Sequence, residues 1–455
     1  MSYQTINPYT EQLVTQFAQF TDEHLATIIA AAEKTFQQDW RYRPLTARQT
    51  VLKKAAALLR EHRDEFAKLA TQEMGKLFRE AQGEITLSAN ILDYYADNAA
   101  LFLADKPLDV SRGEAYVATA PVGVIFCIEP WNFPFYQLAR VAGPNLMAGN
   151  TIIAKHSPNV PLCALAFEKL FLDAGAPDGL YTNVFISNEQ AATVIADTRI
   201  RGVALTGSER AGAAVAAEAG KALKKSTMEL GGSDAFIVLD DANLDDAVKW
   251  GVSGRLFNAG QVCDAAKRFI LDETIADDFL ALFKRSFESI KAGDPMDPTT
   301  TLAPLSSKAA LELALNQIES AVNAGATLLT GGKRMERPGF FLEPTILTNV
   351  SPTNPVYYQE FFSPVAMVFR VNNEQEAIAL ANDSPFGLGC ALMTADVERG
   401  KRIANLIEAG MVFINEAESS SPELPFGGVK NSGYGRELSD LGINEFVNKK
   451  LVRLN

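Results

Sequence analysis

The chain has 455 residues, of which 47% are hydrophobic and 21% are charged, with 31 glycines and 21 prolines. At roughly 150 residues per domain, this length suggests two or three domains, and the composition excludes a collagen-like or disordered chain. The 55 acidic and 42 basic residues give a formal net charge of −13. A net negative charge repels phosphate backbones and anionic lipids, so we expect neither nucleic acid nor a membrane surface as a partner.

The four cysteines are widely spaced and form no CxxC pair, which argues against a disulfide framework or a structural zinc site. The three histidines are too scattered for a His-rich metal centre, so we expect no metal, with only an all-carboxylate site left open. Residues 1–11 lack a signal-peptide pattern, and the longest nearly apolar run, 117–128, is about half of the roughly 20 residues that cross a bilayer. We therefore expect a cytoplasmic protein.

In chain order, residues 21–103 show the three- and four-residue apolar spacing of amphipathic helices, and residues 104–121 can form a β-hairpin. From residue 122 onward, short apolar runs alternate with helical patterns. The predicted strands are 122–128, 151–154, 181–186, 202–205 and 235–239, then 268–271, 327–329, 365–371 and 411–414. The predicted helices are 161–174, 189–196, 212–223, 311–324 and 375–381. This alternation predicts an α/β fold with doubly wound parallel sheets.

Ligands of such sheets bind beyond the carboxyl ends of the strands, so the segments that follow the strands are candidate sites. The turn 206–212 is bounded by glycines and opens a helix, where free N–H groups favour a phosphate. It is neither GxGxxG nor a P-loop, and an ordinary strand-to-helix turn remains the alternative. In the rigid loop 129–134, Asn132 could donate its amide N–H to an oxyanion, or the loop could be a packed turn of prolines and aromatics.

Cys263 follows the glycine-containing turn 258–262 and precedes two cations. It could be a nucleophile if N–H dipoles or cations lower its pKa, or it could be a buried small hydrophobe. Because no histidine follows His156, a Cys–His hydrolase is disfavoured. Glu229 lies among apolar residues and glycines, where burial would raise its pKa into the range of a general base, although an ordinary ion-paired glutamate is also open.

Taken together, these segments resemble the NAD(P)-dependent aldehyde dehydrogenases. The matching segments occur in the order found in that family and cover nearly the whole chain. They are PWNFP at 130–134, GN at 149–150 with Lys155, TGS at 206–208, ELGG at 229–232, GQVC at 260–263, EFFSP at 360–364 and PFGGVKNSG at 425–433.

The resemblance implies an enzyme that oxidises a small-molecule aldehyde to a carboxylic acid. Cys263 would attack the aldehyde, and the Asn132 side chain and the Cys263 N–H would hold the oxyanion of the thiohemiacetal. After hydride transfer, Glu229 would activate the water that hydrolyses the thioester. A non-catalytic relative would have lost one of these three residues. An acyltransferase that uses coenzyme A would usually lack the glutamate.

The resemblance also implies the cofactor site. Lys155 would hold the adenosine ribose, Ser208 the pyrophosphate and Glu360 the nicotinamide ribose, with Phe362 beside the ring. The other expected cofactor contacts are Trp131, Ser157, Pro158, Gly207 and Gly231. NAD-preferring members often carry a glutamate where this chain has Pro158, which leaves NAD and NADP both open because no carboxylate repels a 2′-phosphate.

By the same resemblance, the expected fold has two doubly wound domains and a small oligomerisation hairpin. Residues 1–103 and 121–228 would form the NAD(P)-binding domain and residues 229–433 the catalytic domain. Residues 104–120 and 434–455 would be the oligomerisation elements of a homodimer or a homotetramer.

Within the family, the chain most resembles bacterial succinate-semialdehyde dehydrogenases, which implies succinic semialdehyde as the substrate. Arg140 and either Ser420 or Ser421 would bind its distal carboxylate. Two substrate-site residues depart from the expected pattern: Phe257 replaces a second arginine, and Asp264 would repel an anion but could welcome a neutral or amino-bearing aldehyde. A broad specificity for aliphatic or aromatic aldehydes is the alternative.

Overall fold

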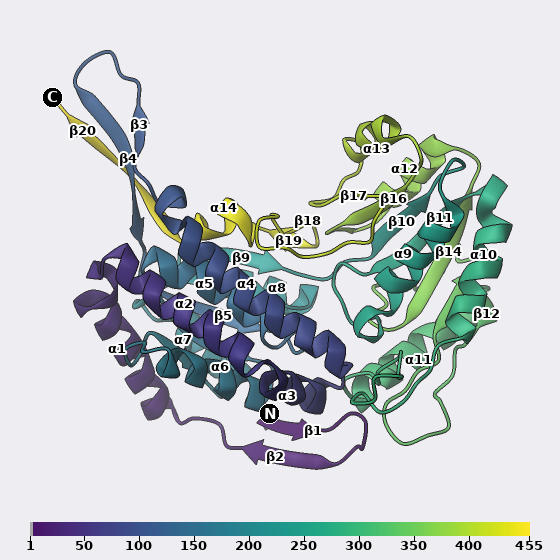
Figure 1. The fold of residues 1–455 in the computed structure, drawn as a ribbon, viewed down its shortest axis with the longest axis horizontal. Coiled ribbons are helices and arrows are strands. Elements are labelled where there is room, and N and C mark those ends of the chain that lie inside the picture. Colours follow the sequence, from purple (N-terminus) through teal and green to yellow (C-terminus); the bar gives the residue numbers. More distant parts are fainter. Residues whose placement is uncertain (1–2) are drawn as a thin grey trace.

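The computed structural model describes residues 3–455, and Figure 1 shows two bodies of strands and helices with a small sheet projecting from one of them. The N-terminal segment forms a hairpin of β1 (Tyr3–Ile6) and β2 (Leu13–Phe17), which the sequence patterns did not predict. The predicted helical region is confirmed and holds α1 (Asp22–Gln38), α2 (Leu45–Glu61), α3 (Arg63–Met74) and α4 (Phe78–Phe102). A 3₁₀ turn, η1 (Trp40–Tyr42), joins the first two.

The first large sheet has six strands in the order β19-β9-β8-β5-β6-β7. All adjacent pairs are parallel except β19 with β9. The strands are β5 (Val124–Glu129), β6 (Thr151–His156), β7 (Tyr181–Asn183), β8 (Ile200–Thr206), β9 (Lys225–Glu229) and β19 (Gly433–Tyr434). The chain winds from β5 to β7 in one direction and then from β8 to β9 in the other. The change of direction between β5 and β8 is where an open sheet of this kind binds ligands.

The helices of this body follow the strands. They are α5 (Tyr136–Ala148), α6 (Pro161–Asp173), α7 (Asn188–Ala196) and α8 (Glu209–Lys221). All 13 residues of α5 are buried, because α2 and α4 cover it on the side away from the sheet. A helix in this position can deliver side chains only to the interior or to the active-site edge.

The second large sheet has seven strands in the order β12-β13-β14-β11-β10-β16-β17. Only β12 is antiparallel to its neighbour, and the sheet is again doubly wound. The strands are β10 (Asp234–Val238), β11 (Ala266–Asp272), β12 (Thr327–Thr330), β13 (Thr345–Thr348), β14 (Val365–Val371), β16 (Cys390–Met393) and β17 (Phe413–Ile414). Its helices are α9 (Leu244–Leu256), α10 (Glu273–Glu288), α11 (Lys308–Asn323), α12 (Glu374–Asn382) and α13 (Val397–Ala404).

The predicted α/β fold with two doubly wound sheets is therefore confirmed. The sequence patterns placed the strand at 235–239 with the first set, but β10 pairs with β11 and β16 and belongs to the second sheet. They also missed β9. Its first half, Lys225 and Ser226, is polar and partly exposed, so this strand has no continuous apolar run.

The predicted hairpin forms β3 (Lys106–Leu108) and β4 (Glu114–Pro121), which pair antiparallel. The C-terminal strand β20 (Val447–Leu454) adds to the other side of β4, in register from Val447 opposite Pro121 to Leu454 opposite Glu114. This three-stranded sheet projects from the first body (Figure 1, upper left). Two short elements precede β20 in the C-terminal segment: β18 (Val429–Lys430), which pairs with β15 (Phe386–Gly387), and α14 (Ser439–Ile443).

Candidate active site

Cys263 lies in a kinked loop between the two large sheets. The loop follows the short 3₁₀ turn η2 (Phe257–Gly260) and leads into β11. Asn258 and Ala259 have φ angles of 51° and 52°, a left-handed conformation that residues other than glycine rarely adopt. At Gly260 a Cβ atom would lie 2.5 Å from the carbonyl oxygen of Ser363, so only glycine fits. This backbone turns the chain sharply just before the cysteine.

Lys267, the second residue of β11, holds this loop from the side of the second sheet. Its Nζ donates to the carbonyl oxygens of Val262 at 2.8 Å and of Cys263 at 2.5 Å, and it forms an ion pair with Glu360 at 2.9 Å. The Lys267 side chain is fully buried. The ammonium group of Lys267 is therefore already bound by two carbonyl oxygens of the loop and by the Glu360 carboxylate.

Asn132 lies beside the cysteine loop. Its Nδ2 donates to the carbonyl oxygen of Gln261 at 3.2 Å, and its own carbonyl oxygen accepts from Asn258 Nδ2 at 3.0 Å. A side-chain amide nitrogen has two protons, so one N–H of Asn132 remains to donate elsewhere. The structure thus brings the predicted oxyanion donor to the predicted nucleophile from a loop about 130 residues away in the chain.

The Asn132 loop is itself fixed by buried polar groups. His156 Nε2 lies 2.9 Å from the carbonyl oxygen of Pro134. The Glu84 carboxylate accepts from the backbone N–H groups of Phe135 at 2.7 Å and Tyr136 at 3.1 Å, and Lys76 pairs with it at 2.5 Å. These contacts hold the start of α5, and with it the amide of Asn132, in a single arrangement.

Glu229 is the last residue of β9 and is 3% exposed. Its two carboxylate oxygens have no hydrogen-bond partner in the part of the chain that the structure describes, and Arg140 Nη2 lies 4.0 Å away. Burial raises the pKa of Glu229 well above its usual value, against the opposing effect of Arg140. A carboxyl group of this kind keeps its proton to a higher pH than an exposed glutamate does, and it is a stronger base once ionised.

The cysteine thiol is also held in its neutral form. Burial raises the pKa of Cys263 well above its usual value, the neighbouring charges of Asp264 and Glu229 raise it further, and Arg140 and Lys267 only partly oppose them. The two cations close to Cys263 therefore do not lower its pKa overall. The thiol must therefore lose its proton when it attacks the aldehyde.

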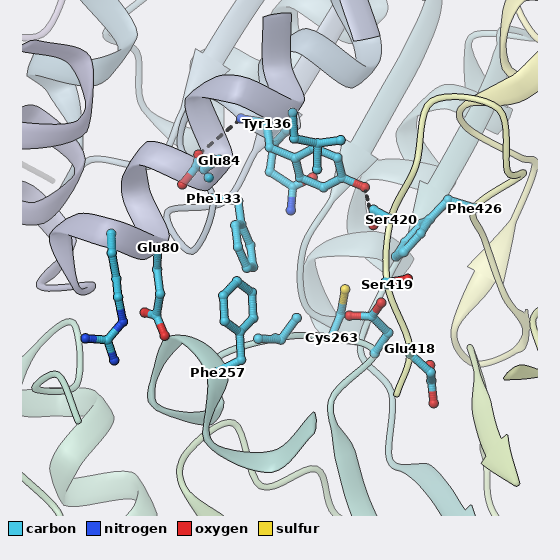
Figure 2. Close-up of a pocket in the computed structure, with 16 residues that line it drawn as sticks. Glu80, Glu84, Phe133, Tyr136, Phe257, Cys263, Glu418, Ser419, Ser420 and Phe426 are labelled. Atoms are coloured by element: carbon cyan, nitrogen blue, oxygen red, sulfur yellow. Dashed lines mark hydrogen bonds between the residues drawn. The ribbon is translucent and has the colours of Figure 1, made fainter. Parts of the chain in front are cut away.

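A cavity of about 570 Å³ opens in front of Cys263 (Figure 2). Its apolar wall includes Phe133, Tyr136, Phe257 and Phe426, and Phe133 stacks on Phe257 with ring centroids 5.9 Å apart. The predicted substrate residues Phe257, Asp264 and Ser420 line this cavity, whereas Arg140 and Ser421 do not.

Arg140 differs from the position expected for a direct carboxylate anchor. Its side chain is completely buried and forms an ion pair through Nε with Glu437. Arg140 Nη1 donates to the Tyr136 hydroxyl at 3.2 Å, and that hydroxyl donates to Ser420 Oγ at 2.8 Å, the dashed contact in Figure 2. The Ser420 proton is then left to donate into the cavity. Arg140 thus reaches the cavity through Tyr136 and Ser420, and its guanidinium carbon lies 4.6 Å from the ring centroid of Phe426 behind the wall.

The residues expected at the adenosine end of a cofactor lie at the carboxyl edge of the first sheet. Lys155 is 6% exposed at the end of β6, and its Nζ donates no hydrogen bond to any residue in the described range 3–455. Pro158 follows in the next loop and accepts from Gln4 N at 2.9 Å, while Ser157 donates to Asn159 Oδ1 at 2.6 Å. A buried lysine without an acceptor fits a ligand that supplies oxygen atoms.

Ser208 and Gly207 lie in the turn between β8 and α8. Ser208 Oγ accepts from Ala211 N at 3.4 Å and caps α8, and Gly207 N donates to the Glu229 carbonyl at 2.9 Å. The first N–H groups of α8 face the edge of the sheet at its change of winding direction, which is a favourable place for a pyrophosphate.

The residues expected at the nicotinamide end form a second group. Glu360 pairs with Lys267 and accepts from Gly232 N at 3.2 Å. A Cβ atom at Gly231 would lie 2.4 Å from Glu360 Oε2, so the absence of a side chain there makes room for the carboxylate. Phe362 meets the edge of Trp131 with centroids 5.7 Å apart.

Sequence reasoning missed Tyr136, Glu437 and Glu418 as site residues. Glu437 lies four residues after the segment at 425–433 that resembles the family, but nothing in the sequence pairs it with Arg140. All four cysteines are free thiols. Among residues 3–455, no group of three or more His, Cys, Asp or Glu side chains is arranged to hold a metal ion, and no helix has the length and hydropathy to span a membrane.

Comparison with known proteins agrees with the geometry. The sequence pattern of the aldehyde dehydrogenase family matches residues 1–452. The chain belongs to this family. It is therefore an oxidoreductase of the aldehyde dehydrogenase fold, as the sequence predicted.

Three of the most similar proteins are close relatives over their whole length. The succinate-semialdehyde dehydrogenase [NADP(+)] of Deinococcus radiodurans is 49% identical, over 99% of this chain and 94% of that one. The structure of succinic semialdehyde dehydrogenase from Streptococcus pyogenes with NADP⁺ has a TM-score of 0.98 at 50% identity and covers 99% of both chains. A structure of the protein Gox0499 has a TM-score of 0.99 at 58% identity and covers 100% of both.

Proposed function

We propose that this chain oxidises succinic semialdehyde to succinate, with NADP⁺ or NAD⁺ as the hydride acceptor. The observation that carries the proposal is the likeness, over nearly the whole chain, to relatives that bear this activity in their names at 49% and 50% identity. The geometry around Cys263 supports it, because a thiol, a free amide N–H and a buried carboxyl group converge at one cavity.

In this proposal Cys263 is the nucleophile. Its Sγ forms a bond to the aldehyde carbon, and its proton passes to a base. The free N–H of Asn132 and the backbone N–H of Cys263 hold the resulting oxyanion. Nicotinamide, when bound, supplies the hydride acceptor. The kinked backbone at 258–260 and the two hydrogen bonds from Lys267 keep the sulfur in place during attack.

Glu229 is the proposed base. Its buried, unpartnered carboxylate removes a proton from the water that attacks the Cys263 thioester, and the C–S bond then breaks to release succinate and the thiol. Arg140 Nη2, 4.0 Å from the Glu229 carboxylate, lowers the pKa of Glu229 and so favours its ionised form. This role explains why the Glu229 carboxyl group accepts no hydrogen bond from another described residue.

The proposed cofactor site joins the two groups of residues at the edge of the first sheet. Lys155 and Ser157 would bind the ribose that carries a 2′-hydroxyl or a 2′-phosphate, Ser208 and Gly207 the pyrophosphate, and Glu360 the second ribose. Burial lowers the pKa of Lys155, and an anionic 2′-phosphate would raise it again. With Pro158 in place of a carboxylate, NADP⁺ is the expected preference and NAD⁺ remains usable.

For the substrate, we propose that Ser420 donates to the distal carboxylate. The hydrogen-bonded chain from Arg140 through Tyr136 leaves the Ser420 proton free, and the buried guanidinium strengthens each donor in the chain. Phe133 and Phe257 would hold the methylene groups.

The expected domain roles also remain proposals: residues 1–103 and 121–228 bind the cofactor, and residues 229–433 carry out catalysis. Residues 104–120 and 434–455 join subunits as a homodimer or homotetramer, because β20 leaves a free edge with Leu451 64% exposed. The four free cysteines suit a reducing cytoplasm.

The test is kcat/KM for succinic semialdehyde, butanal and benzaldehyde, each with NADP⁺ and with NAD⁺. We expect succinic semialdehyde to exceed butanal by more than about tenfold, or about 1.4 kcal/mol of transition-state binding. Equal or higher values for butanal or benzaldehyde would contradict the substrate and favour a broad-specificity enzyme. A requirement for coenzyme A would contradict hydrolysis.

A further inference from the structure

A second cavity of about 220 Å³ lies behind the wall of the first. The two cavities share five lining residues, including Val262 and Asp264, which flank Cys263 on either side. A molecule bound in the second cavity therefore reaches the immediate neighbours of the nucleophile. Ser420 lines only the first cavity.

The second cavity is lined by acidic side chains. Asp264, Glu416 and Glu418 line it, and none of the described lining residues is a lysine, arginine or histidine. Asp264 is 8% exposed, and no other side chain in the described range 3–455 donates a hydrogen bond to its carboxylate. Figure 2 shows Glu418 extending away from Phe133 and Phe257, on the far side of Cys263.

Lys267 only partly opposes the effect of burial on the pKa of Asp264. Lys267 is committed to Glu360 and to two carbonyl oxygens of the cysteine loop. Burial raises the pKa of Glu418, of Asp234 and of Asp264, and the neighbouring Asp234 raises the pKa of Glu418 further. A cation bound in the cavity would favour the ionised forms of Asp264 and Glu418.

The remaining walls are largely apolar and aromatic, with Phe236, Trp250 and Phe257. Aromatic faces attract cations, and they attract ammonium groups most strongly where the cation is desolvated beside a carboxylate. Such a site disfavours carboxylates and phosphates and favours an ammonium group with an apolar surface.

We propose that the second cavity binds the positive charge of aldehydes that carry an ammonium group, and that the enzyme oxidises such aldehydes in addition to succinic semialdehyde. The proposal rests on the proposed function, since the same Cys263 attacks the carbonyl carbon and the same water completes the oxidation to the acid. The two substrate classes would use different walls: Ser420 for a carboxylate and Asp264 with Glu418 for an ammonium group.

The test compares two aldehydes of equal shape, 4-(trimethylammonio)butanal and its neutral isostere 5,5-dimethylhexanal, with NADP⁺. In the wild-type protein we expect kcat/KM to be about tenfold higher for the charged aldehyde. Asp264→Asn and Glu418→Gln should each lower this charged-to-neutral ratio several-fold. The ratio is the readout because loss of Asp264 also removes a charge that raises the pKa of Cys263, which changes the turnover of every aldehyde.

Glu423→Gln is the matched control, because it removes the same charge from an exposed position that lines neither cavity. Its ratio should equal that of the wild type. A wild-type ratio of one or less, or a ratio unchanged in both Asp264→Asn and Glu418→Gln, would overturn the proposal. If succinic semialdehyde is oxidised and the charged aldehyde is not, this inference fails alone. If no aldehyde is oxidised, the proposed function fails.

A second measurement needs no variant. Choline and its neutral isostere 3,3-dimethylbutan-1-ol are compared as protectants of Cys263 against alkylation by iodoacetamide. We expect choline to slow alkylation at concentrations where the isostere does not. Equal protection by both would overturn the assignment of the second cavity to cations.

Discussion

Cys263 and Glu229 are two acids whose pKa values the surrounding protein raises. Burial raises the pKa of each, and the Glu229 carboxylate raises the pKa of Cys263 further. Ionisation of Cys263 supplies the nucleophile and ionisation of Glu229 supplies the base, so the activity of the site depends on pH.

Activity should therefore increase with pH. Because both pKa values are raised, the reactive thiolate and carboxylate are scarce in mild acid and become populated as the pH rises through those values. We expect kcat/KM for succinic semialdehyde to rise from mildly acidic to alkaline conditions, as measured by steady-state kinetics in buffers of constant ionic strength. A profile that falls over this range would show that the essential groups titrate in the opposite sense.

Cys263→Ala should abolish turnover. Removal of a nucleophile that forms the covalent intermediate typically lowers kcat by on the order of 10⁴ to 10⁶. The reduction of NADP⁺ at saturating aldehyde is the measurement, and Cys390→Ala, at a buried free thiol outside both cavities, is the control. Comparable activity in the two variants would refute the role of Cys263.

Tyr136→Phe tests how the charge of Arg140 reaches the substrate. The variant keeps the aromatic wall but breaks the hydrogen-bonded chain to Ser420. We expect the ratio of kcat/KM for succinic semialdehyde to that for butanal to fall about tenfold, mainly through KM. If the ratio is unaltered, Arg140 does not act through this hydroxyl.

Arg140 also shows what the sequence could and could not predict at this scale. Its distance from Asn132 in the chain matched a carboxylate-binding arginine, and the structure does place it next to the cavity wall. The direction of its guanidinium was not predictable, because it depends on Glu437 in a C-terminal segment and on the Tyr136 hydroxyl between it and the cavity.

At the scale of elements, the strand ends and the turns after them position the site. The predicted strands that follow apolar runs were found because a central parallel strand is buried on both faces. Strand β9 was missed because its first residues are polar, although it ends in Glu229. A short strand near a sheet edge has no hydrophobic pattern of its own, and only pairing with β8 defines it.

His156, at the end of β6, links that strand to the Asn132 loop. Its Nδ1 accepts from Ser157 N at 2.8 Å, so the neutral ring carries its proton on Nε2 and donates to the carbonyl oxygen of Pro134. Protonation of Nδ1 would break the contact with Ser157. Burial lowers the pKa of His156 from 6.5 to about 4.

Acid should therefore destabilise the protein through His156. Below pH 6.5 the histidine is protonated in the unfolded chain, whereas in the folded protein it stays neutral down to about pH 4. The free energy of unfolding therefore falls by up to about 3 kcal/mol as the pH is lowered from 6.5 to about 4. Urea unfolding of the wild type and of His156→Gln as a function of pH measures this. The wild type should lose more stability than the variant as the pH falls. Parallel curves would contradict the argument.

At the scale of the whole molecule, two α/β bodies meet at Cys263 and a three-stranded sheet projects outward (Figure 1). The hairpin was predictable from turn residues between short strand-like segments. The family resemblance assigned residues 434–455 to the oligomerisation elements, but the pairing of β20 with β4 was not predicted, since it joins parts of the chain more than 300 residues apart.

The projecting sheet should be where subunits join. Leu451 on β20 is 64% exposed, which favours a partner surface. Leu451→Asp is expected to shift the protein toward monomers in light scattering coupled to size-exclusion chromatography. Leu313→Asp, at a leucine of α11 that is 58% exposed, is the control and should leave the mass unchanged. An unchanged mass for Leu451→Asp would place the interface elsewhere.

The central claim, oxidation of succinic semialdehyde through a thioester on Cys263, is tested most directly with Glu229→Gln. Glutamine has nearly the shape of glutamate and cannot act as a base, so the variant removes this role with little change in packing. The variant is mixed with succinic semialdehyde and NADP⁺, quenched in acid and analysed by peptide mass spectrometry. We expect one equivalent of NADPH and a succinyl group on the peptide that contains Cys263. An unmodified Cys263, or a succinyl group on another residue, would contradict it.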